Sequence, residues 1–214
     1  MAVLKILIAD DHAVVRQGLK FILAEAFKRA SIGEAQNALE LLDLLKKDTW
    51  NAVVMDLTMP GAQGLDILKQ IKHEHPEVPV LILSMHPEDQ YAVRSLKAGA
   101  AGYLTKESAS EELVNALHKI MRGGRYINTS VAERLVLDLG TENERPPHDS
   151  LSDREYQVMC LIASGKEVGQ IAQELSLSVK TISTYRARIL EKMNMKTNAE
   201  LTHYAIQNKL VEPL

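Results

Sequence analysis

Residues 1–125 alternate short apolar runs with longer stretches of helical periodicity, and this alternation constrains the fold more than any other feature. The apolar runs predict strands at Leu4–Ala9, Ser31–Ala35, Ala52–Asp56, Val80–Leu83 and Gly102–Leu104. Strands that alternate with helices of this length are typical of a parallel sheet covered on both faces. Five such units predict an α/β flavodoxin-like (βα)5 fold.

The intervening segments carry apolar residues at the spacing of one helix face. The predicted faces are Val15, Leu19, Ile22 and Leu23 in the first helix, Leu39, Leu42 and Leu45 in the second, and Ile67, Leu68 and Ile71 in the third. The last helix is predicted to begin at a capping box, Ser108–Glu111, and to bury Leu113, Leu117 and Ile120.

The remainder of the chain predicts a second, smaller domain. Residues 126–150 form a linker with one short helix over Thr129–Leu139, because Gly140–Ser150 contains two adjacent prolines and no apolar residue. A second capping box, Ser152–Glu155, opens residues 151–214, where four helical patterns and no strand pattern are found. We therefore expect an α/β domain at 1–125 and a small all-α domain at 151–214.

Composition excludes several classes of protein. With 46% hydrophobic and 25% charged residues, the chain is an ordinary globular protein rather than a disordered or fibrous one. No apolar segment reaches bilayer length, and two aspartates interrupt the apolar N-terminus, so we expect a cytoplasmic protein without membrane partners. The single cysteine, Cys160, forms no intramolecular disulfide and is predicted to be a core residue.

Polar side chains collect where the predicted strands end. Asp10 and Asp11 follow the first strand, Asp56 ends the third, Ser84 follows the fourth and Lys106 follows the fifth. The carboxyl ends of parallel strands meet at one edge of the sheet. Three carboxylates gathered there repel one another unless a divalent cation neutralises them, and Mg²⁺ suits carboxylate oxygens.

At these residues the chain resembles the receiver domain of bacterial two-component response regulators. The resemblance covers residues 1–125 and is carried by ADDH, VVMDLTMPG, LSMH and AGYLTK. It implies that Asp56 accepts a phosphoryl group from a sensor histidine kinase. It also implies that Asp10 and Asp11 hold Mg²⁺ with Asp56 and the carbonyl of Thr58 or Met59.

The same resemblance assigns the remaining residues of the pocket. It implies that Ser84 and Lys106 bind the phosphoryl oxygens and that Tyr103 is a switch residue, rotating inward when Ser84 moves toward the phosphoryl group. The surface around Tyr91, Arg94, Lys97 and Glu111 would then change shape. One departure is Glu107, where many receivers have proline.

Structural roles compete with these functional ones. Asp11 or Ser84 could cap a helix, Tyr103 could pack against a strand, and Lys106 could be a solvated charge. Their joint placement at successive strand ends favours a site.

Two enzyme classes are excluded by particular residues. A phosphatase of the haloacid dehalogenase type needs a carboxylate at the position of Thr58, and a dinucleotide-binding enzyme needs GxGxxG where this chain has ADDHAVV. The chain is therefore predicted not to be an enzyme.

A basic stretch near the C-terminus points to a nucleic acid. Residues 178–196 contain five basic residues and one glutamate, although the whole chain has a net charge of -3. On a helical wheel Ile182, Ile189 and Met193 share a core face, whereas the opposite face carries short polar and basic side chains. Such a face fits the major groove of DNA.

The segment from LSDREY to TNAEL resembles the LuxR-type helix-turn-helix, and its pairing with a receiver is that of the NarL/FixJ family. KTISTYRARILEKM is most similar to the BvgA- and GacA-like members. The resemblance implies a phosphorylation-dependent transcriptional regulator that binds double-stranded DNA as a homodimer, with RNA polymerase as a further candidate partner. Its implied DNA-binding residues are Lys180, Ser183, Thr184, Tyr185, Arg186, Ala187, Arg188 and Lys192.

Three of these residues are distinguished by the wheel and the family position. Ser183, Thr184 and Ala187 would lie at base edges, with Ser178 capping the helix. For Tyr185, core packing and a phosphate contact are both consistent with its position. Arg186 is expected to run its stem along the core and its guanidinium outward.

Overall fold

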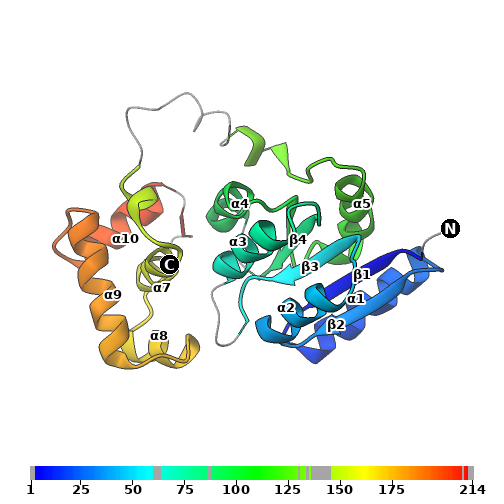
Figure 1. Cartoon of the computed structure of the whole chain (residues 1–214). Helices are drawn as coiled ribbons and strands as arrows, with labels where there is room; N and C mark the ends of the chain where they lie inside the picture. The colour runs from blue at the N-terminus through cyan, green and yellow to red at the C-terminus, as the bar shows by residue number, and fades with distance from the viewer. Residues whose placement is uncertain are drawn as a thin grey trace. The chain divides into compact units, whose positions relative to one another are not determined.

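The computed structural model describes residues 3–59, 64–85, 88–129, 131–133, 135, 146–208 and 210–211. The chain divides into two compact units, Met1–Ala132 and Glu133–Leu214 (Figure 1). Because each unit has its own core, each is described by itself.

The first unit contains a five-stranded parallel sheet. Its strands are β1 (Lys5–Ala9), β2 (Ser31–Ala35), β3 (Ala52–Asp56), β4 (Val80–Ser84) and β5 (Gly102–Thr105), in the spatial order β2-β1-β3-β4-β5. This order confirms the flavodoxin-like prediction. The last two strands are each one residue longer than predicted, since Ser84 and Thr105 are in register with each other.

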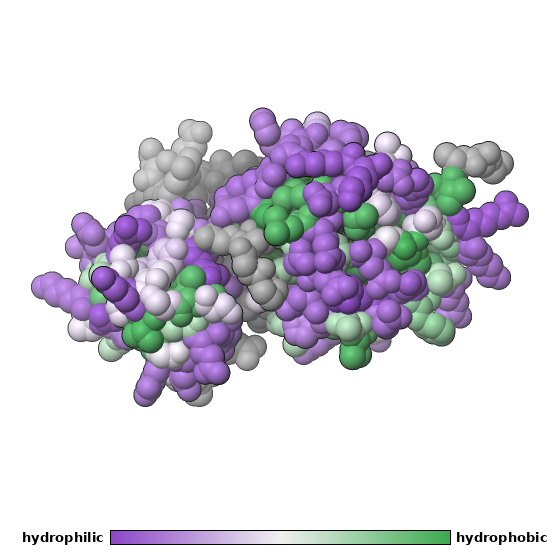
Figure 2. Space-filling view, turned by 60° about the horizontal axis from the view of Figure 1, so that its bottom comes forward, coloured by the Kyte–Doolittle hydropathy of each residue, from purple (hydrophilic) through white to green (hydrophobic). Residues whose placement is uncertain are grey.

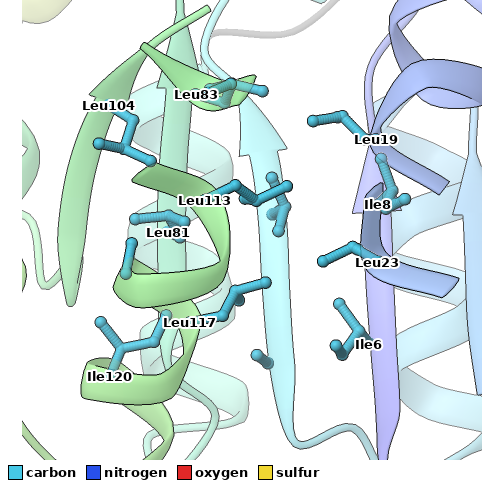
Figure 3. Close-up of a cluster of buried hydrophobic side chains, with 14 residues drawn as sticks. Ile6, Ile8, Leu19, Leu23, Leu81, Leu83, Leu104, Leu113, Leu117 and Ile120 are labelled. Carbon is cyan, nitrogen blue, oxygen red and sulfur yellow. The ribbon is translucent and has the colours of Figure 1, made fainter. Parts of the chain in front are cut away.

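Helices cover both faces of this sheet (Figure 1). They are α1 (Ala13–Ala26), α2 (Ala38–Lys47), α3 (Gly64–Glu74), α4 (Glu88–Lys97) and α5 (Ala109–Met121). On one face, Leu19 and Leu23 of α1 and Leu113 and Leu117 of α5 pack with side chains of β1, β3, β4 and β5 (Figure 3). Burial of this apolar surface stabilises the layer and holds the strand ends in place.

The apolar face of α2 differs from the prediction. Leu39 is 78% exposed, whereas Leu41 is completely buried together with Leu45 and Ala38. Five leucines lie between residues 39 and 45, so two different stripes satisfy helical spacing. Asn37 caps the helix by accepting from the N–H of Glu40, and this start turns Ala38, Leu41 and Leu45 toward the sheet.

The capping box predicted at Ser108 is wrong. Ser108 has helical backbone angles, and its side chain caps no N–H group of α5. Instead its Oγ donates to the carbonyl oxygen of Thr105 at 3.2 Å, and its N–H donates to Thr105 Oγ1. The hydroxyl is therefore used in the tight turn between β5 and α5 rather than in the helix cap.

The second unit is all-helical, as predicted. Its elements are a 3₁₀ helix η1 (Pro147–Ser150), α7 (Asp153–Ala163), α8 (Val168–Glu174), α9 (Val179–Lys192) and α10 (Asn198–Gln207). The second capping box is confirmed, because Ser152 Oγ accepts from the N–H of Glu155 and Glu155 Oε2 accepts from the N–H of Ser152. Ile182 and Ile189 of α9 are completely buried in the core, and Cys160 of α7 is also buried.

Parts of the predicted linker belong to the two units. Tyr126 bridges to Gly102 beside β5, and its hydroxyl donates to Glu112 at 2.9 Å. At the other end, η1 is fixed by a 2.7 Å hydrogen bond between Nδ1 of His148 and the hydroxyl of Tyr204. Of the helix predicted at residues 129–139, Thr129, 131–133 and 135 are helical, and the other residues, like 140–145, lie outside the described part.

The surface in Figure 2 is mostly hydrophilic, with smaller apolar patches between the polar side chains. Among the described residues, the large apolar side chains left exposed are Val3, Val14, Phe21, Leu39, Met85 and Val179. No helix in the described ranges is both long and apolar enough to span a membrane.

Candidate functional site

The sheet brings four of the predicted site residues to one edge. Asp10 follows β1 directly, and its N–H donates to Ala35 at the end of β2. Asp56, the last residue of β3, is in register with Leu83, one residue before Ser84. The N–H of Lys106 donates to the carbonyl oxygen of Ser84 at 2.8 Å, which ties the segment after β5 to the end of β4.

Lys106 lies between two buried carboxylates. Its Nζ is 2.7 Å from Oδ2 of Asp10 and 2.7 Å from Oδ2 of Asp56, and these two aspartates are 1% and 2% exposed. Burial raises the pKa of Asp56 above its usual range, although the hydrogen bond from Lys106 opposes this. Burial lowers the pKa of Lys106, but its two carboxylate partners outweigh burial, so the net shift is upward. Lys106 therefore stays an ammonium ion in the pocket.

The other oxygen of Asp56 also has a partner. Oδ1 accepts the N–H of Thr58 at 3.0 Å, which fixes the carboxylate plane against the chain that leaves β3. A carboxylate whose two oxygens have fixed partners presents a defined face to a reacting group. Asp56 is thus both oriented and shielded from bulk water.

The residues at this edge fit a divalent cation. Asp10, Asp11, His12 and Asp56 each offer one ligand atom, and these atoms all lie within 4.8 Å of one another. Oδ1 of Asp11 is buried and accepts no hydrogen bond from the described residues, whereas Oδ2 of Asp10 pairs with the ammonium ion of Lys106 at 2.7 Å. A buried carboxylate oxygen without a hydrogen bond suits Mg²⁺, which prefers oxygen ligands.

Two residues that support this pocket were missed from the sequence. Arg16, one turn into α1 and 7% exposed, donates from Nη1 to the carbonyl oxygen of Asp10 at 2.8 Å. Its Nε lies 3.7 Å from Glu34 of β2. His12 places Nδ1 close to both Asp10 and Asp11. A charged residue on the buried side of α1, one turn after ADDH, was the signal available for Arg16.

The predicted switch residue, Tyr103, is buried in this structure, at 2% exposure. Its rotation on phosphorylation stays a prediction. Tyr91, predicted to line a responsive surface, is also buried at 5% exposure. The outward side of this region is instead represented by the exposed Lys97 and Glu111.

The outer face of α9 is exposed, as the helical wheel predicts. Its exposed residues are Lys180, Ser183, Thr184, Ala187, Arg188 and Glu191, and Lys192 at the end of the helix is also exposed. The helix begins at Ser178, whose side chain accepts from the N–H of Thr181 at 3.0 Å. Val179, which is 56% exposed in the first turn, was not predicted on this face.

The hydroxyl groups of this face have a defined orientation. Ser183 donates to the carbonyl oxygen of Val179 at 2.9 Å, and Thr184 donates to that of Lys180 at 3.0 Å. With its proton bound to the helix backbone, each hydroxyl oxygen presents only acceptor lone pairs outward. The face can accordingly recognise hydrogen-bond donors.

The basic residues of α9 differ in exposure and in their contacts within the domain. Arg188 and Lys180 are exposed. Arg186 is half-buried and donates from Nε to Asn198 at 2.6 Å, which connects α9 with α10. Tyr185 is half-buried at the border of the core, the position the wheel indicates.

Comparison with known families agrees with both units. Residues 6–118 match the response regulator receiver domain, and residues 149–205 match the bacterial regulatory proteins of the luxR family. Response regulator UvrY of Escherichia coli K12 is 35% identical over 97% of this chain and 95% of its own length. Response regulator GacA of Pseudomonas aeruginosa is 35% identical over 98% of each chain.

Solved structures extend the comparison to the whole chain. A structure of RcsB from Salmonella typhimurium is 26% identical, with a TM-score of 0.66 over 97% of this chain and 99% of that one. A structure of the RcsB–DNA complex is 28% identical, with a TM-score of 0.58 over 95% and 98%. From its two domains and its full-length relatives, this chain belongs to the two-component response regulators that regulate transcription through a LuxR-type DNA-binding domain.

Proposed function

We propose that Asp56 is the phosphoacceptor and that a sensor histidine kinase is its phosphoryl donor. The observation that carries this proposal is the contact of Lys106 Nζ with both Asp10 and Asp56 in a buried pocket. An ammonium ion fixed 2.7 Å from the reacting carboxylate can neutralise charge on a transferring phosphoryl group. Asp10 and Asp11, with Asp56, would hold Mg²⁺, which when bound neutralises phosphoryl oxygens.

The reaction assigned to Asp56 is a nucleophilic displacement at phosphorus. A carboxylate oxygen forms the new P–O bond, the P–N bond to the kinase histidine breaks, and its electron pair returns to the imidazole. Burial raises the pKa of Asp56, so the carboxylate is more basic and a better nucleophile than an exposed aspartate. Ser84, buried at the end of the neighbouring strand, would bind a phosphoryl oxygen.

Intact-mass measurement tests the acceptor. Incubation with Mg²⁺ and acetyl phosphate should add one phosphoryl group to the wild type and none to Asp56→Asn. Asp66→Asn is a matched control, because Asp66 is an exposed aspartate on α3. Full labelling of Asp56→Asn would show that the acceptor is another residue.

We further propose that α9 reads DNA. The oriented oxygens of Ser183 and Thr184 would accept hydrogen bonds from adenine or cytosine amino groups, and the methyl group of Ala187 would contact a thymine methyl group. Arg188 and Lys180 would bind phosphates. A cytoplasmic location follows from these proposed partners, a kinase domain and DNA.

Phosphorylation is proposed to promote a homodimer, or alternatively to free α9 for binding. RcsB dimers have been solved bound to DNA, which supports the dimer for this chain. Two copies would bind half-sites about one helical turn apart. Sedimentation with and without acetyl phosphate separates the alternatives, since only the dimer changes the molecular mass in the absence of DNA.

A further inference from the structure

We infer that Arg16 is a positioning residue for the divalent ion: it holds the peptide unit between Asp10 and Asp11 and so makes the pocket bind Mg²⁺ more tightly. The inference rests on the proposed function, because it concerns the ion proposed for the same pocket. In this role Arg16 contacts neither the ion nor the phosphoryl group, and it acts through the backbone of Asp10.

Arg16 occupies a position on α1 where an apolar side chain would be expected. It shares the buried stripe of the helix with Leu19 and Leu23, and it is only 7% exposed. A guanidinium group is always charged, and a buried charge is costly unless its partners compensate for it. The partners of this buried cation therefore indicate what it does.

The first partner belongs to the acidic pocket. Nη1 of Arg16 donates to the carbonyl oxygen of Asp10 at 2.8 Å, in a buried contact. This carbonyl is part of the planar peptide unit that joins Asp10 to Asp11. The hydrogen bond consequently fixes the orientation of the backbone between two of the proposed ligands.

The second partner balances the charge of Arg16. Nε lies 3.7 Å from Oε2 of Glu34 on β2, and Oε1 of the same carboxylate accepts from Nζ of Lys20 at 2.5 Å. Because Glu34 compensates the guanidinium, repulsion between Arg16 and a divalent ion is reduced. The effect of Arg16 on the ion is then mainly geometric.

Asp11 depends on this geometry more than Asp10 does. Asp10 is also held by its N–H, which donates to Ala35, and by Oδ1, which accepts the N–H of His12 at 2.8 Å. Oδ1 of Asp11, in contrast, is buried and accepts no hydrogen bond from the described residues. The backbone that Arg16 holds thus orients Asp11, and Mg²⁺ tolerates little departure from octahedral geometry.

Calorimetric titration of Mg²⁺ into the full chain tests the inference. We expect Arg16→Met to weaken Mg²⁺ binding about tenfold, as is typical when a group that orients a metal ligand is lost. Arg16→Lys should be weakened similarly, because it keeps the charge but not the planar fork that faces Asp10 and Glu34 together.

Lys20→Met is the matched control for these variants. It removes the other cation beside Glu34 but leaves the bond from Arg16 to Asp10, so it should change the Mg²⁺ constant by less than about twofold. Wild-type affinity in either Arg16 variant would overturn the inference. Tighter Mg²⁺ binding by Arg16→Met would overturn it as well, since that is the result expected if the buried charge only repelled the ion.

Labelling of Asp56 by acetyl phosphate over a range of Mg²⁺ concentrations separates positioning from loss of the fold. In Arg16→Met the half-saturating Mg²⁺ concentration should rise about tenfold, with the maximal rate restored at saturation. A labelled fraction that stays low at every Mg²⁺ concentration would mean that Arg16 only stabilises the fold, and would overturn the inference. Absence of labelling in the wild type would refute the phosphoacceptor instead, while the calorimetric constants still decide the role of Arg16.

Discussion

Nζ of Lys192, at the end of α9, lies 2.6 Å from Oε2 of Glu155 in the first turn of α7. The same oxygen accepts the N–H of Ser152, so one buried carboxylate joins the capping box of α7 to the helix proposed to read DNA. The predicted contact of Lys192 with DNA stays a prediction. In the structure Lys192 also joins α9 to α7, which gives it a positioning role.

Removal of this ion pair should destabilise the DNA-binding unit in a pH-dependent way. Burial alone raises the pKa of Glu155, but Lys192 and the Ser152 N–H outweigh burial, so the net shift is downward from 4.5. A lowered pKa stabilises the fold above pH 4.5, and this contribution is lost as pH falls through the lower folded value. Lys192→Met should cost about 1 kcal/mol at pH 7, because its half-exposed ammonium is screened by water.

This contribution is measured by urea unfolding of the wild type and of Lys192→Met. The pH is varied from about 3 to about 7, a range that covers the titration of a carboxyl group. The difference between the two proteins should shrink toward low pH. Lys196→Met, a change of an exposed lysine just after α9, serves as the control. A stability difference that is independent of pH would contradict an electrostatic role of Lys192.

The sequence predicted elements well where only one pattern was available. The boundaries of β2 and β3, the buried face of α5 and the core face of α9 all follow from periodicity. The prediction was wrong at α2, where Leu39 and Leu41 belong to two equally regular stripes. It was also wrong at Ser108, whose hydroxyl bonds to a turn that periodicity does not describe.

The candidate site, too, could be predicted from the sequence only in part. Asp10, Asp56 and Lys106 converge because parallel strand ends meet at one edge, which the sequence reveals. The contact of Arg16 with the Asp10 carbonyl depends on the angle at which α1 leaves the sheet. Contacts of this kind are set by tertiary packing, and no local pattern predicts them.

Asp56→Asn is predicted to stabilise the metal-free receiver. Burial raises the pKa of Asp56 above 3.8, so the folded state disfavours the ionised carboxylate, and stability falls as pH rises through the folded value. The amide removes this charge with almost no change of shape. Thermal unfolding with a chelator at pH 7 should show a Tm about 4 °C higher than wild type. A lower Tm for Asp56→Asn, with Asp66→Asn unchanged, would show that the ionised carboxylate of Asp56 does not destabilise the metal-free fold.

Lys106→Met should have the opposite effect on the same unit. It leaves the buried carboxylates of Asp10 and Asp56 without their cation, at a cost of about 3 kcal/mol. Because a divalent cation can replace the lost charge, Mg²⁺ should restore more stability to Lys106→Met than to wild type. Denaturant titrations with Mg²⁺ and with chelator measure this, and Lys28→Met on the exposed surface is the comparison. Equal stabilisation of all three proteins by Mg²⁺ would show that Lys106 and the divalent cation do not neutralise the same carboxylates.

Two helical glycines, one crowded and one with open space around it, form a matched pair for testing packing. A Cβ at Gly64, the first residue of α3, would lie 2.3 Å from the backbone oxygen of Leu57, next to Asp56. Gly64→Ala should cost about 1–3 kcal/mol and reduce labelling of Asp56. A Cβ at Gly18 in α1 meets nothing within 4 Å, so Gly18→Ala should stabilise by about 0.5–1 kcal/mol. Chemical denaturation and intact mass check both; a neutral Gly64→Ala would mean that the loop after β3 can move.

Arg188→Ala and Thr184→Val should weaken DNA binding in different ways. Arg188 is an exposed cation, so its loss should weaken binding to operator and random duplexes alike and reduce the salt slope by about one.

Thr184→Val keeps the shape of the side chain but removes its hydroxyl group. In the wild type this hydroxyl donates its proton to the carbonyl oxygen of Lys180 and presents its oxygen outward. Operator affinity should fall by about 1–3 kcal/mol, with random-duplex affinity unchanged. Arg29→Ala, an exposed arginine in the receiver, controls for net charge. Fluorescence anisotropy over a range of salt concentrations distinguishes the two roles, and equal losses on both duplexes for Thr184→Val would remove it from base recognition.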